Sequence, residues 1–341
     1  MKLLNILALI LLFAAGLAAH EYKIDFVKSI GDEREDYTFF KINSIIMTDN
    51  TKDIYVADLA GHFISKYNWD GKFIKRIGQK GNGPGDFGII NSLDFYNNKL
   101  YIWDYENIRI ATMEPDLTNL NYIKLQSKFF RYCFPIEGNR FIGDYFSISQ
   151  NKGRIGIVNT EGDLIFHFFD KLPIKVDLKD RKIVFLSGLM TLNMNLSPER
   201  DKVLVSFSRP NNPIDFYIYN LKGELIKQFN YKIDEKFRFP GHLLNTQEPI
   251  PEKYYSLSVE SVFFYKNNYI VFYSEISHLN EKEESENFCL IFNDSGEVIQ
   301  KIKLDKNIYV FYLSNEGYLL GSDIDSDLSK VFIYQLKELK K

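Results

Sequence analysis

The chain has 341 residues, of which 45% are apolar, and it contains 22 Tyr and 29 Phe. This content supports a large buried core and excludes an intrinsically disordered chain. The formal net charge is −3, which argues against nucleic acid as the main partner, because that binding depends on Lys and Arg neutralising phosphates.

The first nineteen residues have the layout of a cleavable export signal. "MKLLNILALILLFAAGLAA" carries Lys2, then an apolar run, then small residues up to Ala19. A membrane anchor is the alternative, but it would need about 20 apolar residues and usually a charged flank. We therefore expect residues 1–19 to be removed, leaving residues 20–341 as one domain without a stable membrane anchor. The mature protein would then be periplasmic or extracellular.

Beyond this leader, the chain repeats a pattern of paired β-strands. Each repeat of the pattern joins two β-rich runs through a polar turn that usually contains Gly, the signature of a β-hairpin. Five such hairpins cover residues 63–77, 108–125, 154–169, 215–229 and 288–302. A further strand pair precedes each of them, and a sixth pair follows the last, at residues 42–58, 89–104, 132–145, 194–207, 262–273 and 310–323. The repeating unit therefore has four strands, with insertions expected at about 171–187 and 231–257.

The two ends of the chain complement each other. The last unit ends after its third strand, within residues 330–341, whereas residues 22–30 resemble a fourth strand that has no unit of its own. Pairing these two segments would close a ring and leave only short sheet edges. A sandwich or a solenoid would not explain this offset. The sequence therefore predicts an all-β, six-bladed β-propeller of four-stranded antiparallel blades, and we expect a monomer.

A glycine-rich stretch, "GQKGNGPGD" at residues 78–86, lies between the first and second units. A phosphate-binding loop would require a helix to begin directly after the glycines. The following residues have no helical period, so we interpret the stretch as a crossing between blades.

Residues 40–125 resemble the repeats of NHL-type six-bladed β-propellers. Asp104, Asn107, Arg109 and Ile110 match the motif of that family, and Asp58 matches it where Gly61 and His62 replace other residues. The resemblance implies that the connections between second and third strands, and those between blades, share one face around a central channel. We name it the connection face; in such propellers it is the usual ligand face. Some similar propellers are Ca²⁺- or Zn²⁺-dependent lactonases, esterases or lyases.

Polar residues open most of the predicted connections on this face. The candidate ligand-face residues are Asp58, His62, Asp104, Arg109, Asp144, Arg209, Glu275 and His278. Carboxylates could bind Ca²⁺, and a weaker metal candidate is the acidic stretch with Asp323, Asp325 and Asp327. The structural alternative is that these Asp side chains accept backbone hydrogen bonds in their own turns or pair with an arginine.

Three further features complete the prediction. Cys133 and Cys289 lie in strand-like runs and read as buried thiols, with a mutual disulfide left open. Residues 280–287 read as a solvated loop tip, and the insertion at 231–257 as a lid or partner-binding loop.

We expect an exported binding protein for an unidentified small-molecule or protein ligand. The alternative is a metal-dependent hydrolase or lyase.

Overall fold

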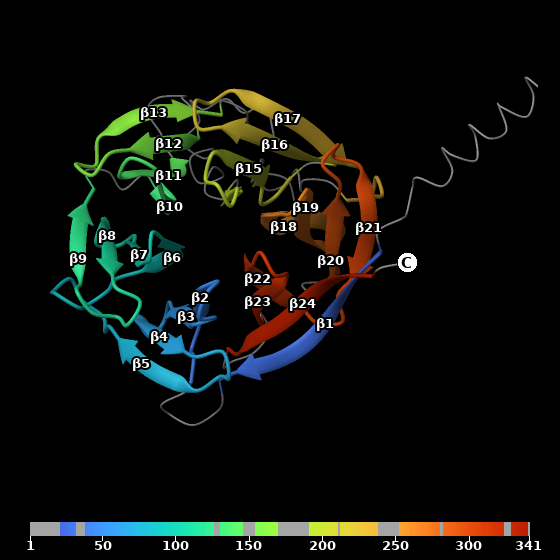
Figure 1. Ribbon diagram of the computed structural model, residues 1–341. Coiled ribbons are helices and arrows are strands. Elements are labelled where there is room, and N and C mark those ends of the chain that lie inside the picture. Colours follow the sequence, from blue (N-terminus) through green and yellow to red (C-terminus); the bar gives the residue numbers. More distant parts are fainter. Residues whose placement is uncertain are drawn as a thin grey trace, which may run out of the picture.

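The computed structural model describes residues 21–31, 38–125, 130–145, 154–169, 191–210, 212–237, 252–279, 282–323 and 329–339. Within these ranges, twenty-four β-strands form six four-stranded antiparallel sheets. The sheets are arranged around a central axis like the blades of a propeller (Figure 1). The predicted all-β, six-bladed β-propeller is therefore confirmed. None of the described segments is a helix that could cross a membrane.

The blades follow the chain order. Blade 1 contains β2 (Ile42–Met47), β3 (Ile54–Asp58), β4 (Phe63–Tyr67) and β5 (Phe73–Ile77). Blade 2 contains β6 (Ile90–Tyr96), β7 (Lys99–Asp104), β8 (Arg109–Met113) and β9 (Asn121–Lys124). Blade 3 contains β10 (Phe130–Ile136), β11 (Arg140–Tyr145), β12 (Ile155–Val158) and β13 (Leu164–Phe168).

The second half of the ring continues in the same way. Blade 4 contains β14 (Leu192–Leu196), β15 (Lys202–Phe207), β16 (Ile214–Asn220) and β17 (Leu225–Tyr231). Blade 5 contains β18 (Lys253–Tyr265), β19 (Asn268–Leu279), β20 (Lys282–Phe292) and β21 (Val298–Lys303). Blade 6 contains β22 (Ile308–Leu313), β23 (Tyr318–Asp323), β24 (Val331–Leu339) and, from the other end of the chain, β1 (Glu21–Ile30).

The N-terminal strand closes the ring, as the sequence predicts. β1 pairs with β24 in antiparallel register from Glu21↔Leu339 to Ile30↔Val331, and the two strands lie side by side in Figure 1. Tyr22 also binds blade 5, because its backbone N–H donates to Gln300 Oε1 at 2.6 Å and its hydroxyl accepts from Asn268. The seam thus joins the two ends of the chain in blade 6 and links β1 to blade 5.

The core of the molecule lies between neighbouring blades. Each of the six blade interfaces has its own apolar cluster, which is formed by alternate side chains of the two facing sheets. Between blades 2 and 3, for example, Trp103 is almost fully buried and its indole N–H donates to Phe130 O at 3.1 Å. Each fully buried aromatic or aliphatic side chain contributes about 1.5–3 kcal/mol, so the ring is stabilised interface by interface.

Blade 5 differs from the prediction because its inner three strands are unusually long. Residues 253–257, predicted as the end of an insertion, begin β18, and residues 274–287, predicted as a connection, belong mostly to β19 and β20. The pairing runs out to Lys253↔Leu279 and Leu279↔Lys282. The polar composition of residues 274–287 resembles that of a loop because most of the described residues in this part of β19 and β20 are partly or fully exposed to solvent. Residues 171–187 and 280–281 lie outside the described part.

Both cysteines are buried and free. Cys133 lies in β10 of blade 3 and Cys289 in β20 of blade 5, so the structure excludes their mutual disulfide. Burial raises the pKa of both thiols above the ordinary value, which suppresses the reactive thiolate. They act as small apolar core residues, as expected.

Candidate functional site

Asp58 organises the connection face of blade 1. Its fully buried carboxylate accepts hydrogen bonds from the backbone N–H groups of Phe40, at 2.6 Å, and Gly61, at 2.7 Å, with a longer bond from Lys41. It therefore links the entry into β2 with the turn that follows β3. The Asp58 carboxylate is therefore engaged by backbone groups of the protein itself.

Asp104 and Arg109 do the same in blade 2, where they also bind the glycine-rich crossing. Arg109 Nε donates to the buried carboxylate of Asp104 at 3.0 Å, and its two terminal nitrogens donate to backbone carbonyls of Asn82 and Asp86. Asn107 donates to Asp104 and to Gly81 O. The crossing thus presents carbonyl oxygens to a cation, and a strand, β6, follows it at Ile90. It is built as a crossing between blades.

Of the remaining predicted residues, only His62 joins the group in blade 2. Its Nδ1 lies 2.6 Å from Gly88 O, and Gly88 N–H donates to Asp104, so His62, Asp104 and Arg109 lie close together. The others have separate positions: Asp144 pairs with Arg154 at 3.1 Å, Glu275 pairs with Lys301 at 2.8 Å, His278 stacks on Tyr254, and Arg209 is exposed. Glu275 and His278 lie in β19, which corrects their predicted place in a loop.

The metal candidates are not assembled in the described part of the chain. Asp323 ends β23, whereas Asp325 and Asp327 lie outside the described residues. Among the residues that are described, no group of three His, Cys, Asp or Glu side chains could hold a metal ion.

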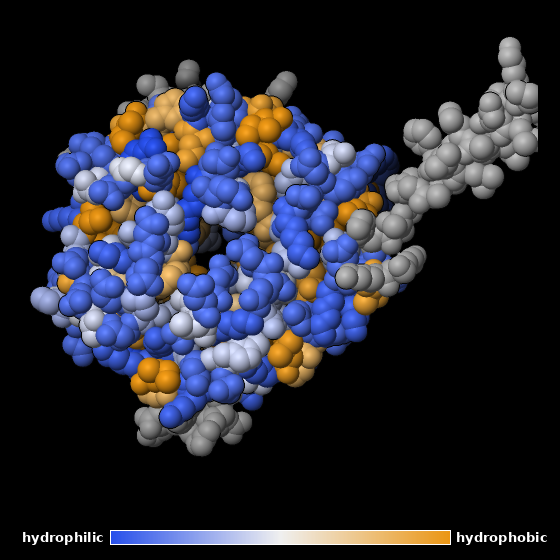
Figure 2. Space-filling view, viewed as in Figure 1, coloured by the Kyte–Doolittle hydropathy of each residue, from blue (hydrophilic) through white to orange (hydrophobic). Residues whose placement is uncertain are grey.

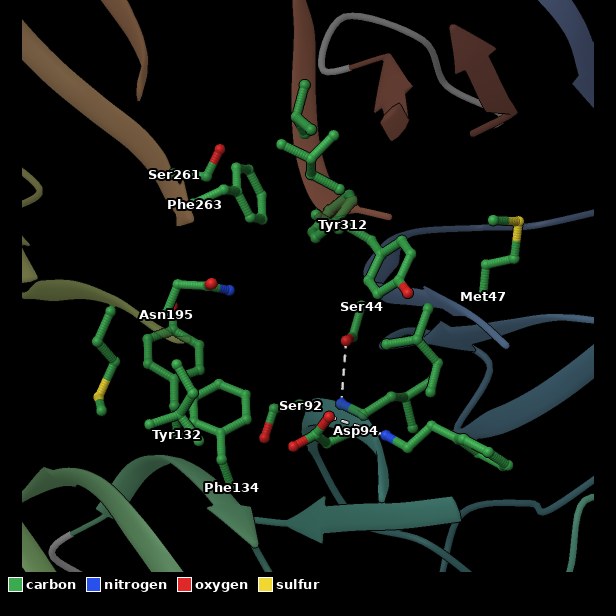
Figure 3. A pocket seen from close by; sticks show the side chains of 18 of the residues that line it. Ser44, Met47, Ser92, Asp94, Tyr132, Phe134, Asn195, Ser261, Phe263 and Tyr312 are labelled. Atoms are coloured by element: carbon green, nitrogen blue, oxygen red, sulfur yellow. Dashed lines mark hydrogen bonds between the residues drawn. The ribbon is translucent and has the colours of Figure 1, made fainter. Parts of the chain in front are cut away.

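The central channel forms a cavity of about 740 Å³ that is lined mainly by the inner strands. Figure 2 shows its opening at the centre of the disc. Inside it, aromatic and polar side chains from different blades point into a shared space, including Tyr132, Phe134, Asn195, Ser261 and Tyr312 (Figure 3). A concave site of this size with mixed lining is typical of small-molecule binding.

A ring of six equivalent residues lies near the connection-face end of this channel. Each inner strand contributes one residue, either at the register shift of that strand (blades 1, 2, 3 and 5) or directly after Leu192 and Ile308 (blades 4 and 6), and all six line the cavity. We call this ring the channel belt; in blade order it consists of Asn43, Asn91, Tyr132, Asn193, Glu260 and Tyr309.

The three asparagines of the channel belt connect neighbouring blades. Asn43 donates to Ile90 O at 2.7 Å, Asn91 donates to Arg131 O at 3.1 Å, and Asn193 donates to Val259 O. Each acceptor directly precedes the next blade's belt residue. Serines add to this pattern, since Ser44 Oγ accepts from Leu93 N–H at 3.0 Å (Figure 3). These three of the six belt residues thus hold neighbouring blades together.

The other half of the channel belt departs from this pattern. Tyr132, Glu260 and Tyr309 replace the bridging asparagine in blades 3, 5 and 6. Next to Glu260, the hydroxyl of Ser261 is buried without a hydrogen-bond partner among the described residues, although the equivalent Ser44 accepts an N–H of the next blade. Breaks in an internal repeat that leave polar groups unsatisfied are expected at functional sites.

Glu260 has the most perturbed carboxyl group in the channel. Burial raises its pKa above the ordinary value, and hydrogen bonds from Ser258 and Ser274 together with Arg209 offset only part of that rise. The side chain still touches the cavity. Burial also raises the pKa of Tyr132 and Tyr309, and Tyr309 interacts electrostatically with both Tyr132 and Glu260. All three of these belt residues line the same cavity.

The opposite end of the channel has a different character. Arg200, in the β14–β15 turn, reaches past blade 3 to Asp94 of blade 2, with two bonds of 2.6 and 2.8 Å. Its guanidinium also donates to Pro135 O at 2.7 Å. This ion pair is therefore satisfied within the protein.

Sequence reasoning did not find the channel belt. A signal was present, since "INS" occurs at residues 42–44 and 90–92, at the start of β2 and β6, and "ES" occurs at 260–261 within β18. The predicted candidates came instead from the ends of the second strands, which lie one layer away from the axis.

Comparisons with known proteins agree with the architecture. Residues 32–182 match the family model DUF5128, described as a 6-bladed beta-propeller. This match spans less than half of the chain, over blades 1–3. No curated protein matches the sequence.

Several solved structures are similar over nearly the whole chain. A member of the DUF4221 family from Bacteroides vulgatus has a TM-score of 0.65 and 12% identity, covering 95% of this chain and 100% of its own. A "putative exported protein" of Bacteroides fragilis has a TM-score of 0.59 and 14% identity, covering 93% and 95%. The PQQ-bound aldose sugar dehydrogenase of Streptomyces coelicolor has a TM-score of 0.53 and 8% identity, covering 93% and 99%. At these identities the likeness concerns the fold alone.

The belt does not suit a metal-dependent enzyme. Ca²⁺ takes six to eight oxygen ligands, usually with several carboxylates, and the channel belt offers one carboxylate. Zinc sites use Cys, His and acidic ligands, and the belt contains neither His nor Cys. The six residues of the channel belt therefore do not by themselves form a usual Ca²⁺ or Zn²⁺ site.

Proposed function

We propose that this protein is an exported binding propeller that holds a small organic molecule at the channel belt. The observation that carries the proposal is the replacement of bridging asparagines by Tyr132, Glu260 and Tyr309. Removing the Glu260 carboxyl group from water costs free energy, so these three residues do not improve the stability of the fold. We infer that they are present because they contact a ligand.

Two further expectations belong to this proposal. The leader at residues 1–19 supports export, and the motif of Asp104, Asn107 and Arg109 supports a relation to NHL-type repeats. In this chain the motif binds the crossing at 78–86. It thus has a structural use that is separate from the channel.

Thermal unfolding with a compound panel tests the proposal. The panel contains sugars, amino acids, organic acids and organic cations, applied to the wild type, to Tyr309→Trp and to Tyr105→Trp. Tyr309→Trp enlarges a side chain inside the channel, whereas Tyr105 is 37% exposed and provides a matched control. We expect at least one class to raise the Tm of the wild type and the control but not that of Tyr309→Trp. Equal shifts in all three proteins, or no shift in the wild type, would contradict the proposal.

Chelation separates this proposal from the metal-dependent alternative. Because the belt has a single carboxylate, we expect EDTA to leave the Tm unchanged and elemental analysis to find no stoichiometric Ca²⁺ or Zn²⁺. A bound ion together with a lower Tm in EDTA would favour the enzyme and count against the binding proposal.

A further inference from the structure

We propose that the ligand of the channel belt is an organic ammonium ion, held beside the Glu260 carboxylate and against the rings of Tyr132 and Tyr309. This inference rests on the proposed function and specifies the chemistry of its ligand. It follows from the placement of one carboxyl group among aromatic rings in a desolvated channel.

The aromatic rings line the same cavity as Glu260. Tyr132 comes from blade 3 and Tyr309 from blade 6, which lie on opposite sides of a six-bladed ring. Phe311 adds a third ring, with its centroid 4.6 Å from that of Tyr309. An ammonium group over aromatic faces is stabilised by the ring quadrupole, by about 2 kcal/mol or more when the site is desolvated.

The carboxyl group supplies the opposite charge. Glu260 accepts a hydrogen bond from Ser274 Oγ at 3.1 Å, and no described salt bridge involves it. The exposed Arg209 lowers the pKa of Glu260, and Glu283 opposes that effect. A ligand cation would supply the counter-charge within the channel and favour the ionised carboxylate. The unpartnered hydroxyl of Ser261 lies beside it and could accept a hydrogen bond from a ligand N–H or O–H.

A neutral or anionic ligand fits the cluster less well. An anion would meet the Glu260 carboxylate, and a neutral molecule would leave its charge uncompensated or keep it protonated. The ion pair of Arg200 and Asp94 already satisfies itself at the far end, so it gives an anion no free partner there.

Isothermal titration with choline chloride tests this inference. The matched neutral probe is 3,3-dimethyl-1-butanol, which has the same shape without the charge. We expect choline to bind the wild type and the alcohol to bind about tenfold more weakly or not at all. Glu260→Gln should weaken choline binding about tenfold, whereas Glu275→Gln, a carboxylate in the same blade paired with Lys301, should leave it unchanged.

Two variants of Tyr309 separate the ring from its hydroxyl. Tyr309→Phe keeps the aromatic face and should bind choline within about twofold of the wild type, whereas Tyr309→Leu should lose about tenfold. Circular dichroism and the Tm confirm that each variant is folded.

The outcomes distinguish the two proposals. Equal binding of choline and the alcohol, or an unchanged affinity in Glu260→Gln, would overturn the ammonium inference. If choline fails while another compound class binds at the belt, the inference is wrong and the proposed function stands. If no class binds at the belt, both are wrong.

Discussion

At the residue scale, the acidic side chains of this protein divide into two kinds. Asp58, Asp104 and Asp144 are buried, but each is compensated by backbone N–H groups or an arginine. Glu260 has two hydroxyl partners, and these together with Arg209 offset only part of the cost of burying its charged form. A carboxylate with this kind of environment is a better candidate for a ligand contact than one that already holds its own fold.

This difference predicts a pH-dependent stability. Because the folded-state pKa of Glu260 is raised above its ordinary value of 4.5, the native protein holds this proton more tightly than the unfolded chain. Stability from this group is therefore present below pH 4.5 and is lost as the pH rises through the folded pKa. Glu260→Gln is uncharged throughout, so we expect its Tm to equal that of the wild type at acidic pH and to exceed it near neutral pH.

Thermal unfolding at a series of pH values checks this prediction. The charged and titratable groups that act on Glu260, namely Arg209, Glu283 and Tyr309, are present in both proteins, as is Tyr132, so the difference reports the Glu260 charge together with its interactions with them. A Glu260→Gln variant that is less stable at neutral pH, or a difference that does not change with pH, would show that the carboxylate is well compensated.

At the element scale, the glycine-rich crossing is fixed by one side chain. Gly78 and Gly85 adopt positive φ, which glycine tolerates without strain, and Arg109 binds the carbonyls of Asn82 and Asp86. Its guanidinium also stacks on Tyr122, 4.0 Å from the ring centroid. The crossing therefore gains its order from blade 2.

Replacing this arginine should destabilise blade 2 and expose the crossing. We expect Arg109→Met to lose about 3 kcal/mol of the free energy of unfolding, because it leaves the Asp104 carboxylate buried and unpaired. Urea unfolding measures the loss, and limited proteolysis should cut within residues 78–86. Lys124→Met, an exposed cation on the adjoining strand, is the control. If both variants lose equally little, the arginine does not hold the crossing.

At the scale of the whole molecule, the ring depends on β1. This strand completes blade 6 and carries the buried side chains of Tyr22 and Ile30 into the neighbouring interfaces. Without it, β24 would be an exposed edge and the clusters on either side of blade 6 would lose part of their cover.

Deletion at the seam is expected to affect all six blades together. A protein without residues 1–30 should have a markedly lower Tm than one that lacks only residues 1–19, because the whole ring loses its closure. Differential scanning calorimetry compares the two, and the longer protein serves as the control. Equal melting temperatures would mean that β1 is dispensable for the ring.

The sequence by itself determined the architecture. Alternating apolar residues, turn residues at regular intervals and a fourth strand displaced to the other end specify six blades and their seam, because strand and turn preferences act over a few neighbouring residues. The same local view misread residues 274–287, since a strand wetted on both faces has the composition of a loop. Only the tertiary structure decided the site: Tyr132, Glu260 and Tyr309 are far apart along the chain, and only closure of the ring brings them to one channel.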